Sequence, residues 1–165
     1  MTMKILIVAV LLAFSLSLFA QKNIIGRYRD YFGSRIELNA DSTFKYTWHF
    51  DLASSWTKGT WSLKNDTLYL RMTPTYDTIS FKNNDGAAAD KLILSVDETS
   101  ERLTPELYAG TGLSSGGQNR MDYPDKLFFK SGRLYKIRDG RRVVKKQKGF
   151  WTSKKWDPWF FKSDD

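Results

Sequence analysis

The sequence contains no cysteine and only one histidine, His49. The absence of cysteine excludes disulfides, thiol catalysis and thiolate metal sites. A zinc site built from imidazole and thiolate ligands is excluded too, and a Ser-His-Asp triad would have to use His49. His49 falls on the polar face of a predicted strand, so we expect an exposed side chain there rather than a catalytic one. We expect no cofactor, no metal and no catalytic residue.

Signatures of other enzyme chemistry are also missing. The glycine-rich stretch Gly110–Gly117 lacks the following helix and the Lys-Ser/Thr pair of a phosphate-binding loop. Acidic residues are scattered over turns and strand ends, and no pair of them indicates a glycosidase. A hydrolase is therefore the least supported function, and a binding function is favoured.

Residues 1–20 have the composition of a secretory signal peptide. Lys4 precedes an apolar run from Ile5 to Phe19, and small residues at Ser17 and Ala20 favour cleavage before Gln21. The apolar run is short for a membrane span, although an uncleaved anchor is the alternative. We expect an exported protein, periplasmic or extracellular, with no transmembrane span in the mature chain.

Charge is divided unevenly along the chain. Residues 21–125 hold 12 Lys/Arg against 14 Asp/Glu, whereas residues 126–165 hold 13 against 4, a net charge of +9. A basic segment of this kind favours an anionic partner. In an exported protein we expect an anionic envelope surface (lipid or glycan) or a protein rather than nucleic acid.

Apolar and polar residues alternate with period two over much of the chain. In "STFKYTWHFD", Phe44, Tyr46, Trp48 and Phe50 fall on one face, which predicts a half-buried strand. Turn residues at 39–42, 65–66, 131–132 and 139–140 predict hairpins. No window keeps a helical period over three turns, and Pro105 interrupts the nearest one, 98–108. About nine short strands predict an all-β fold, an antiparallel barrel with a β-sandwich as the alternative.

The expected organisation is a single β-barrel domain over residues 21–165. Within it, the Gly/Ser-rich stretch 110–125 is predicted to be a flexible loop. The basic, Trp-rich C-terminal segment covers residues 126–165.

Residues 24–72 carry a family resemblance. Gly26-Arg27-Tyr28 is similar to the Gly-x-Trp opening of lipocalin-like barrels, with Tyr in place of Trp. The run "IELNADSTFKYTW…KGTWSLKNDTLYL" resembles the first hairpins of lipocalin-like (calycin-type) domains in secreted bacterial proteins. The resemblance implies an up-and-down barrel that binds a small apolar or amphipathic ligand in its mouth. The basic tail is not part of that family pattern.

Two groups of residues are candidate sites. The first would line a ligand cavity, although alternating aromatics more often fill a small barrel; it consists of Tyr46, Trp48, Trp61 and Leu70. The second would form an interaction surface that interleaves cations with aromatics; it consists of Arg141, Arg142, Lys145, Lys146, Trp151, Lys154, Lys155 and Trp156.

The tail has a structural alternative, in which its aromatic residues close the fold. Asp157-Pro158 predicts a turn that divides it. We expect residues 159–161 to form a closing strand and residues 151–156 to be available to a partner.

Overall fold

The computed structural model describes residues 24–83, 85–111, 116–119 and 121–163. The predicted signal peptide and its cleavage site lie outside these residues. So do residues 112–115 and 120 of the predicted flexible loop.

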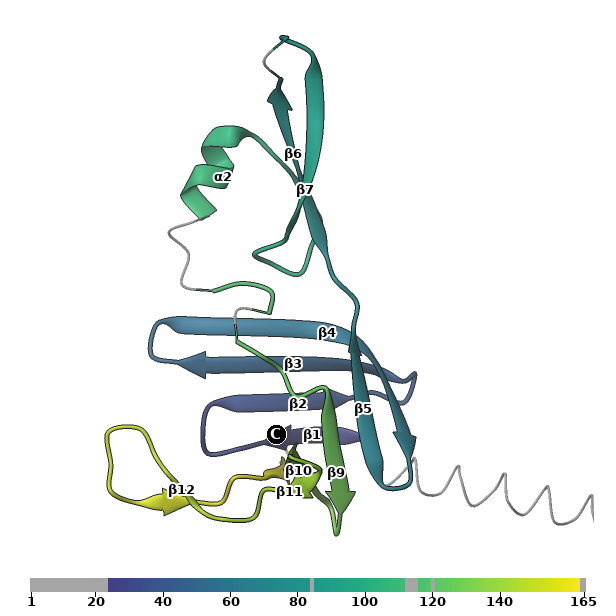
Figure 1. Cartoon of the computed structure of the whole chain (residues 1–165), viewed down its shortest axis with the longest axis vertical. Helices are drawn as coiled ribbons and strands as arrows, with labels where there is room; N and C mark the ends of the chain where they lie inside the picture. The colour runs from purple at the N-terminus through teal and green to yellow at the C-terminus, as the bar shows by residue number, and fades with distance from the viewer. Residues whose placement is uncertain (1–23, 84, 112–115, 120, 164–165) are drawn as a thin grey trace, which may run out of the picture.

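Eight antiparallel strands form a closed barrel (Figure 1). Each strand pairs with the next one along the chain, and the last pairs with the first, so the barrel is of the up-and-down type. The all-β barrel prediction is confirmed, and the sandwich alternative is not adopted. The barrel strands are β1 (Gly26–Arg29), β2 (Ser34–Leu38), β3 (Thr43–Phe50), β4 (Ala53–Lys64), β5 (Thr67–Met72), β9 (Lys126–Lys130), β10 (Arg133–Arg138) and β14 (Phe160–Ser163).

The tight turns have the backbone that their sequences predict. Asn65 and Asp66 both have positive φ, 49° and 57°, between β4 and β5. Ser131 and Gly132 do the same between β9 and β10, with φ of 51° and 71°. Two successive residues with positive φ are typical of type I′ turns, whose twist matches that of the flanking strands.

Alternate residues of the barrel strands point inward and form one hydrophobic core. The Tyr28 hydroxyl donates a hydrogen bond to the carbonyl of Ile24 (2.7 Å), so the polar atom of this buried residue is satisfied. Burial raises the pKa of Tyr28 to about 12. Phe160 of the closing strand is fully buried. The fully or nearly fully buried core members are Ile24, Tyr28, Ile36, Leu38, Phe44, Tyr46, Trp61, Leu68, Leu70, Leu127, Leu134 and Phe160.

The chain between β5 and β9 forms an arm that extends away from the barrel (Figure 1). It contains a three-stranded sheet of β6 (Tyr76–Lys82), β7 (Ala88–Leu94) and β8 (Arg102–Leu103), followed by helix α2 (Pro105–Thr111). Strands β6 and β7 therefore pair with each other, and β6 with β8, and not with the barrel strands. Pro105 begins the helix instead of interrupting one, because the first helical position does not need its N–H.

Part of the Gly/Ser-rich stretch lies against the barrel. Gly117 and Asn119 exchange backbone hydrogen bonds with Trp56 of β4, and Gln118 forms a bridge with the same residue. The Gln118 side chain is buried and its Oε1 accepts from the Thr75 N–H (3.1 Å). These contacts join the return of the arm to the barrel wall.

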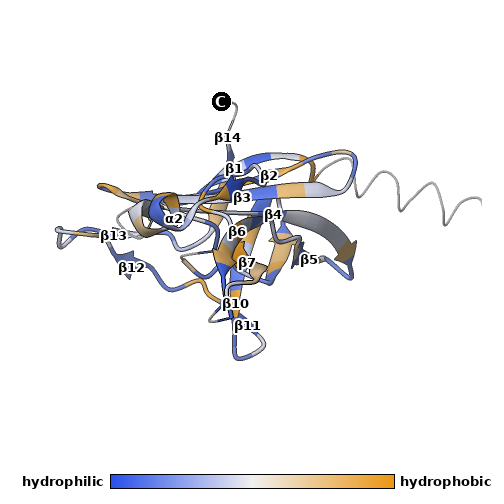
Figure 2. Cartoon of the chain, turned by 90° about the horizontal axis from the view of Figure 1, so that it is seen from above, coloured by the Kyte–Doolittle hydropathy of each residue, from blue (hydrophilic) through white to orange (hydrophobic). Residues whose placement is uncertain are grey.

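The chain between β10 and β14 forms two small projections. The first is β11 (Arg141–Arg142), which pairs with the end of β10. The second is a hairpin of β12 (Gln147–Lys148) and β13 (Lys155–Trp156). Figure 2 shows this hairpin on a different side of the barrel from the β10–β11 turn.

Candidate functional site

The four predicted cavity residues lie on the barrel interior. Tyr46, Trp61 and Leu70 are buried in the core, and Trp48 is half-buried against it. Their polar atoms have protein partners: Tyr46 Oη donates to Ser34 Oγ (3.2 Å), Trp61 Nε1 to the Asn39 carbonyl (3.1 Å), and Trp48 Nε1 to the Phe32 carbonyl (3.1 Å). Burial also raises the pKa of Tyr46. These contacts serve the fold; ligand binding by the four residues stays a prediction.

The β12–β13 hairpin is held on the barrel by two aromatic contacts. Phe150 packs on Phe50, with ring centroids 4.2 Å apart, and Trp156 stacks on Tyr31 at 4.7 Å. Gly149 allows the hairpin to close over Trp156, because a Cβ there would lie 2.9 Å from the indole ring. Aromatic pairs of this kind contribute about 0.5–1.5 kcal/mol each beyond the area they bury. The hairpin is therefore fixed in position.

Trp151 lies at the tip of this fixed hairpin and is 95% exposed. Its indole makes no ring contact and no hydrogen bond with any residue that the structure describes. Its φ is 54°, a left-handed conformation that residues other than Gly, Asn and Asp seldom adopt. An exposed indole on a left-handed backbone brings the fold no packing benefit. The packing of the fold therefore does not account for a tryptophan at this position.

Lysines surround this tip. Lys148 and Lys155 are paired across the hairpin and are exposed. Lys154 Nζ lies 4.0 Å from the centroid of the Trp156 ring, a cation–π contact that leaves the ammonium exposed. Trp151 and three lysines thus form a cationic tip with one apolar side chain, which we call the hairpin tip (Lys148, Trp151, Lys154, Lys155).

The other predicted surface residues are not all in the same place. Lys145 is exposed, and Lys146 forms an ion pair with Asp157 at 3.6 Å. Arg141 and Arg142 lie on β11, and the Arg142 guanidinium carbon is 4.8 Å from the centroid of Phe128 on the barrel wall. The eight residues therefore divide between the hairpin and the β10–β11 turn. Both are accessible, but they do not form one patch.

The structure adds neighbours that sequence reasoning missed. Tyr31, which stacks on Trp156, also packs on Phe161 of β14 with centroids 5.0 Å apart. The Arg29 guanidinium carbon lies 5.3 Å from the Phe161 ring centroid. A continuous row of cations and aromatics, Lys154, Trp156, Tyr31, Phe161 and Arg29, therefore runs from the hairpin onto the outer face of β14 and β1. Its members come from both ends of the chain, so only the β1–β14 pairing brings them together.

Comparisons with known proteins add no relative: no family model, no curated protein and no solved structure matches the chain. Within the residues that the structure describes, no helix has the length and apolar character needed to cross a bilayer.

Proposed function

We propose that the chain is an exported, non-catalytic binding protein that attaches to an anionic lipid surface through the hairpin tip. The observation that carries the proposal is Trp151, 95% exposed between Lys148 and Lys154 on a hairpin fixed to the barrel. Indole rings partition to the headgroup region of bilayers, and lysines near an anionic surface contribute about 1 kcal/mol each. The net charge of +9 over residues 126–165 supports attraction to such a surface.

The other part of this proposal is that the barrel is a lipocalin-like domain. A closed eight-stranded barrel with strands in chain order is the architecture expected of a lipocalin-like domain, and Tyr28 lies on its first strand. The predicted signal peptide would place the protein in the periplasm or outside the cell. Carriage of a small apolar or amphipathic ligand ranks second, because Tyr46, Trp61 and Leu70 are buried in the core.

Vesicle flotation tests the lipid proposal. The mature chain is mixed with phosphatidylcholine vesicles and with vesicles that also contain phosphatidylglycerol. We expect binding to the anionic vesicles only, weakening as salt rises because exposed charges are screened within about 8–10 Å at physiological ionic strength. Equal binding to both kinds of vesicle would contradict the proposal.

A pair of charge-matched variants locates the binding surface. The hairpin variant replaces Lys148, Lys154 and Lys155 with Gln. The control variant replaces three exposed lysines elsewhere, Lys64, Lys82 and Lys91, with Gln. At about 1 kcal/mol for each lysine, the hairpin variant should bind roughly 100-fold more weakly, and the control should change little. Equal losses in the two variants would show attraction to net charge alone and would overturn the assignment to the hairpin.

A further inference from the structure

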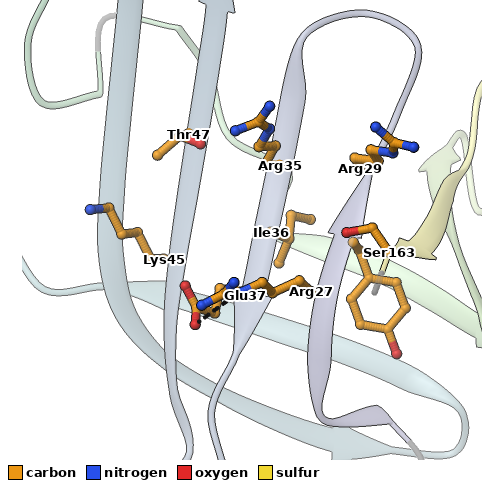
Figure 3. A pocket seen from close by; sticks show the side chains of 9 residues that line it. Arg27, Arg29, Arg35, Ile36, Glu37, Lys45, Thr47 and Ser163 are labelled. Atoms are coloured by element: carbon orange, nitrogen blue, oxygen red, sulfur yellow. Dashed lines mark hydrogen bonds and ion pairs between the residues drawn. The ribbon is translucent and has the colours of Figure 1, made fainter. Parts of the chain in front are cut away.

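Two parts of the outer barrel wall are rich in cations, and they differ in charge balance. Figure 3 shows the first, the outer face of β1, β2 and β3. There Arg27 Nε lies 3.4 Å from Glu37 Oε1, and Lys45 forms an ion pair with Glu98 of the arm. Carboxylates of the chain itself therefore accompany these two cations.

The second part, the outer face of β9, β10 and β11, has no such balance. Residues 126–142 hold seven Lys/Arg and a single acid, Asp139. Among these seven, Lys136 alone forms an ion pair within the described part of the chain, and its partner is the buried Asp30. The other six side chains are exposed. This part of the wall is therefore strongly cationic.

A row of aromatic side chains crosses the same face. Phe128 of β9 pairs directly with Tyr135 of β10, and the ring centroid of Trp159 lies 5.5 Å from that of Tyr135. Each of the three is next to a fully buried core residue in the chain, so the three rings face outward. Strands in a sheet lie about 4.8 Å apart, so the row is about 10 Å long.

Two guanidinium groups lie over this row. The guanidinium carbon of Arg142 is 4.8 Å from the Phe128 ring centroid and 5.8 Å from that of Tyr135, and that of Arg133 is 5.4 Å from the Trp159 centroid. Neither arginine makes an ion pair or hydrogen bond with a residue that the structure describes. The rings thus restrain the two guanidiniums without using their N–H donors.

We propose that this face, which consists of Arg133, Arg142 and the row Phe128, Tyr135 and Trp159, binds an acidic polysaccharide whose sugars carry carboxylates. A guanidinium binds a carboxylate through two parallel N–H donors. Sugar rings present C–H groups on their faces, and these pack on half-exposed aromatic side chains. A row about 10 Å long has room for two sugar rings. The surrounding cations attract a polyanion to the face.

The way the rings lie on this face favours a glycan over a bilayer or a protein. A bilayer anchor protrudes from the surface, as Trp151 does with 95% of its side chain exposed, whereas the three rings of the row are half-buried. A protein interface has an apolar centre depleted of charge, and here guanidiniums lie over the rings. This site is separate from the hairpin tip and does not depend on it.

Calorimetric titration of the mature chain with oligogalacturonate, at constant ionic strength, tests the site. The matched ligand is the same oligosaccharide with its carboxylates methyl-esterified, which keeps the sugar rings and removes the charge. Oligoguluronate and hyaluronate oligomers are titrated in the same way. We expect saturable binding to at least one of the three acidic chains, and at least tenfold weaker binding of the ester than of oligogalacturonate if that chain binds. No saturable binding to any of the three, equal binding of the ester, or tighter binding of a single-stranded oligonucleotide would overturn the proposal.

Three arginine variants separate recognition from net charge. Arg142→Gln should weaken binding of the acidic oligosaccharide at least tenfold. Arg142→Lys keeps the charge but loses the planar pair of donors, so it should weaken binding severalfold. The matched control Arg35→Gln removes an exposed strand arginine on β2, outside this face, and should leave affinity unchanged. Equal losses in Arg142→Gln and Arg35→Gln, or wild-type affinity in Arg142→Lys, would mean that net charge alone is recognised and would contradict the site.

Melting temperatures keep the result separate from folding. The acidic oligosaccharide should raise the melting temperature of the wild type and of Arg35→Gln, but not that of Arg142→Gln. If Arg142→Gln melts much lower and the oligosaccharide still raises its melting temperature, Arg142 only covers the rings and the proposal is wrong.

The hairpin variant Trp151→Asn distinguishes this site from the lipid proposal. Trp151→Asn should lose vesicle binding and keep oligosaccharide binding, and Arg142→Gln should do the reverse. Oligosaccharide binding by a wild type that does not bind vesicles would support the glycan site and leave the lipid proposal without support. Loss of oligosaccharide binding in Trp151→Asn would contradict a site on β9–β11 that is independent of the hairpin.

Discussion

Phe160 and Trp151 belong to the same aromatic stretch near the C-terminus, yet one side chain is buried and the other is exposed. Phe160 is 0% exposed and lies in the core, whereas Trp151 is 95% exposed at a hairpin tip. Asp157 and the fully buried Pro158 lie between them, at the point where the chain turns into β14. The comparison shows that aromatic content alone does not distinguish a buried residue from an exposed one. Phe160 is buried because it lies on a strand, β14, that pairs with β10 and β1.

The buried half of this stretch completes the barrel. Phe160 pairs with Leu134 of β10, and its neighbour Phe161 pairs with Arg29 of β1, so β14 provides the closing seam. The exposed half lies outside the barrel. Phe150 packs on Phe50 of β3, and Trp156 stacks on Tyr31, which packs on Phe161 of the seam. Substitutions in the two halves should therefore affect different properties: stability in the first, surface binding in the second.

The largest expected effect is that of Phe160→Ala. Removing a fully buried phenylalanine leaves a cavity at the seam and should lower the free energy of unfolding by about 3–5 kcal/mol. Urea unfolding followed by circular dichroism measures it. The neighbouring variant Phe161→Ala, on the outer face, should lower it by about 1 kcal/mol. Similar losses of unfolding free energy in both variants would mean that the inner face of β14 contributes no more to stability than its outer face.

A second prediction concerns Tyr28 on β1, the strand that pairs with β14. The pKa of Tyr28 is raised to about 12 by burial, whereas the unfolded chain titrates near 10.0. The stability due to the neutral phenol is thus complete below pH 10 and is lost as pH rises from about 10 to about 12, by roughly 2–3 kcal/mol. Tyr46, whose pKa is also raised, acts in the same direction.

Alkaline urea titrations of wild type and Tyr28→Phe check this. The variant should lose its hydrogen bond to the Ile24 carbonyl, about 1 kcal/mol at neutral pH, but should decline less steeply above pH 10. Parallel pH profiles for the two proteins would show that Tyr28 does not cause the alkaline loss.

Much of the barrel was predictable because its strands and turns are encoded locally. The period-two pattern of β3 and the turn residues Asn65-Asp66 and Ser131-Gly132 each determine structure within a few residues. The exposed His49 follows from the same alternation. The separate sheet of β6, β7 and β8 was not predicted, because a strand pattern does not show which sheet a strand joins.

The candidate surface was only partly predictable for the same reason. Trp151 and Lys154 stood out by composition, but Tyr31 and Arg29 become their neighbours only through the pairing of β1 with β14. Arg29 and Arg35 lie opposite each other only in the β1–β2 register that the structure shows, and this register depends on where the turn at 30–33 begins. Which strands pair, and in which register, cannot be read from a single sequence, so these neighbours could not be predicted.

A smaller effect is expected at Phe150, which belongs to both sides of the comparison. Its ring packs on Phe50 and, edge-on, on Phe32, yet it is 49% exposed. Phe150→Ala should lower the free energy of unfolding by about 1 kcal/mol, because it removes aromatic contacts that are partly solvated. Its affinity for anionic vesicles should fall less than that of the triple-lysine variant. A stability loss as large as that of Phe160→Ala would place the hairpin within the core and contradict the division drawn above.

The smallest expected change in stability, and the only favourable one, is that of Trp151→Asn. Asn accepts the left-handed backbone that Trp151 holds at φ 54°, and no packing is lost at a side chain that is 95% exposed. The free energy of unfolding should stay the same or rise by up to about 1 kcal/mol. Binding to anionic vesicles should fall about tenfold, since the apolar anchor is gone. Urea unfolding and vesicle flotation on the same preparation measure both quantities. A destabilised variant would mean that Trp151 serves the fold, and it would remove the contrast with Phe160 on which the lipid proposal rests.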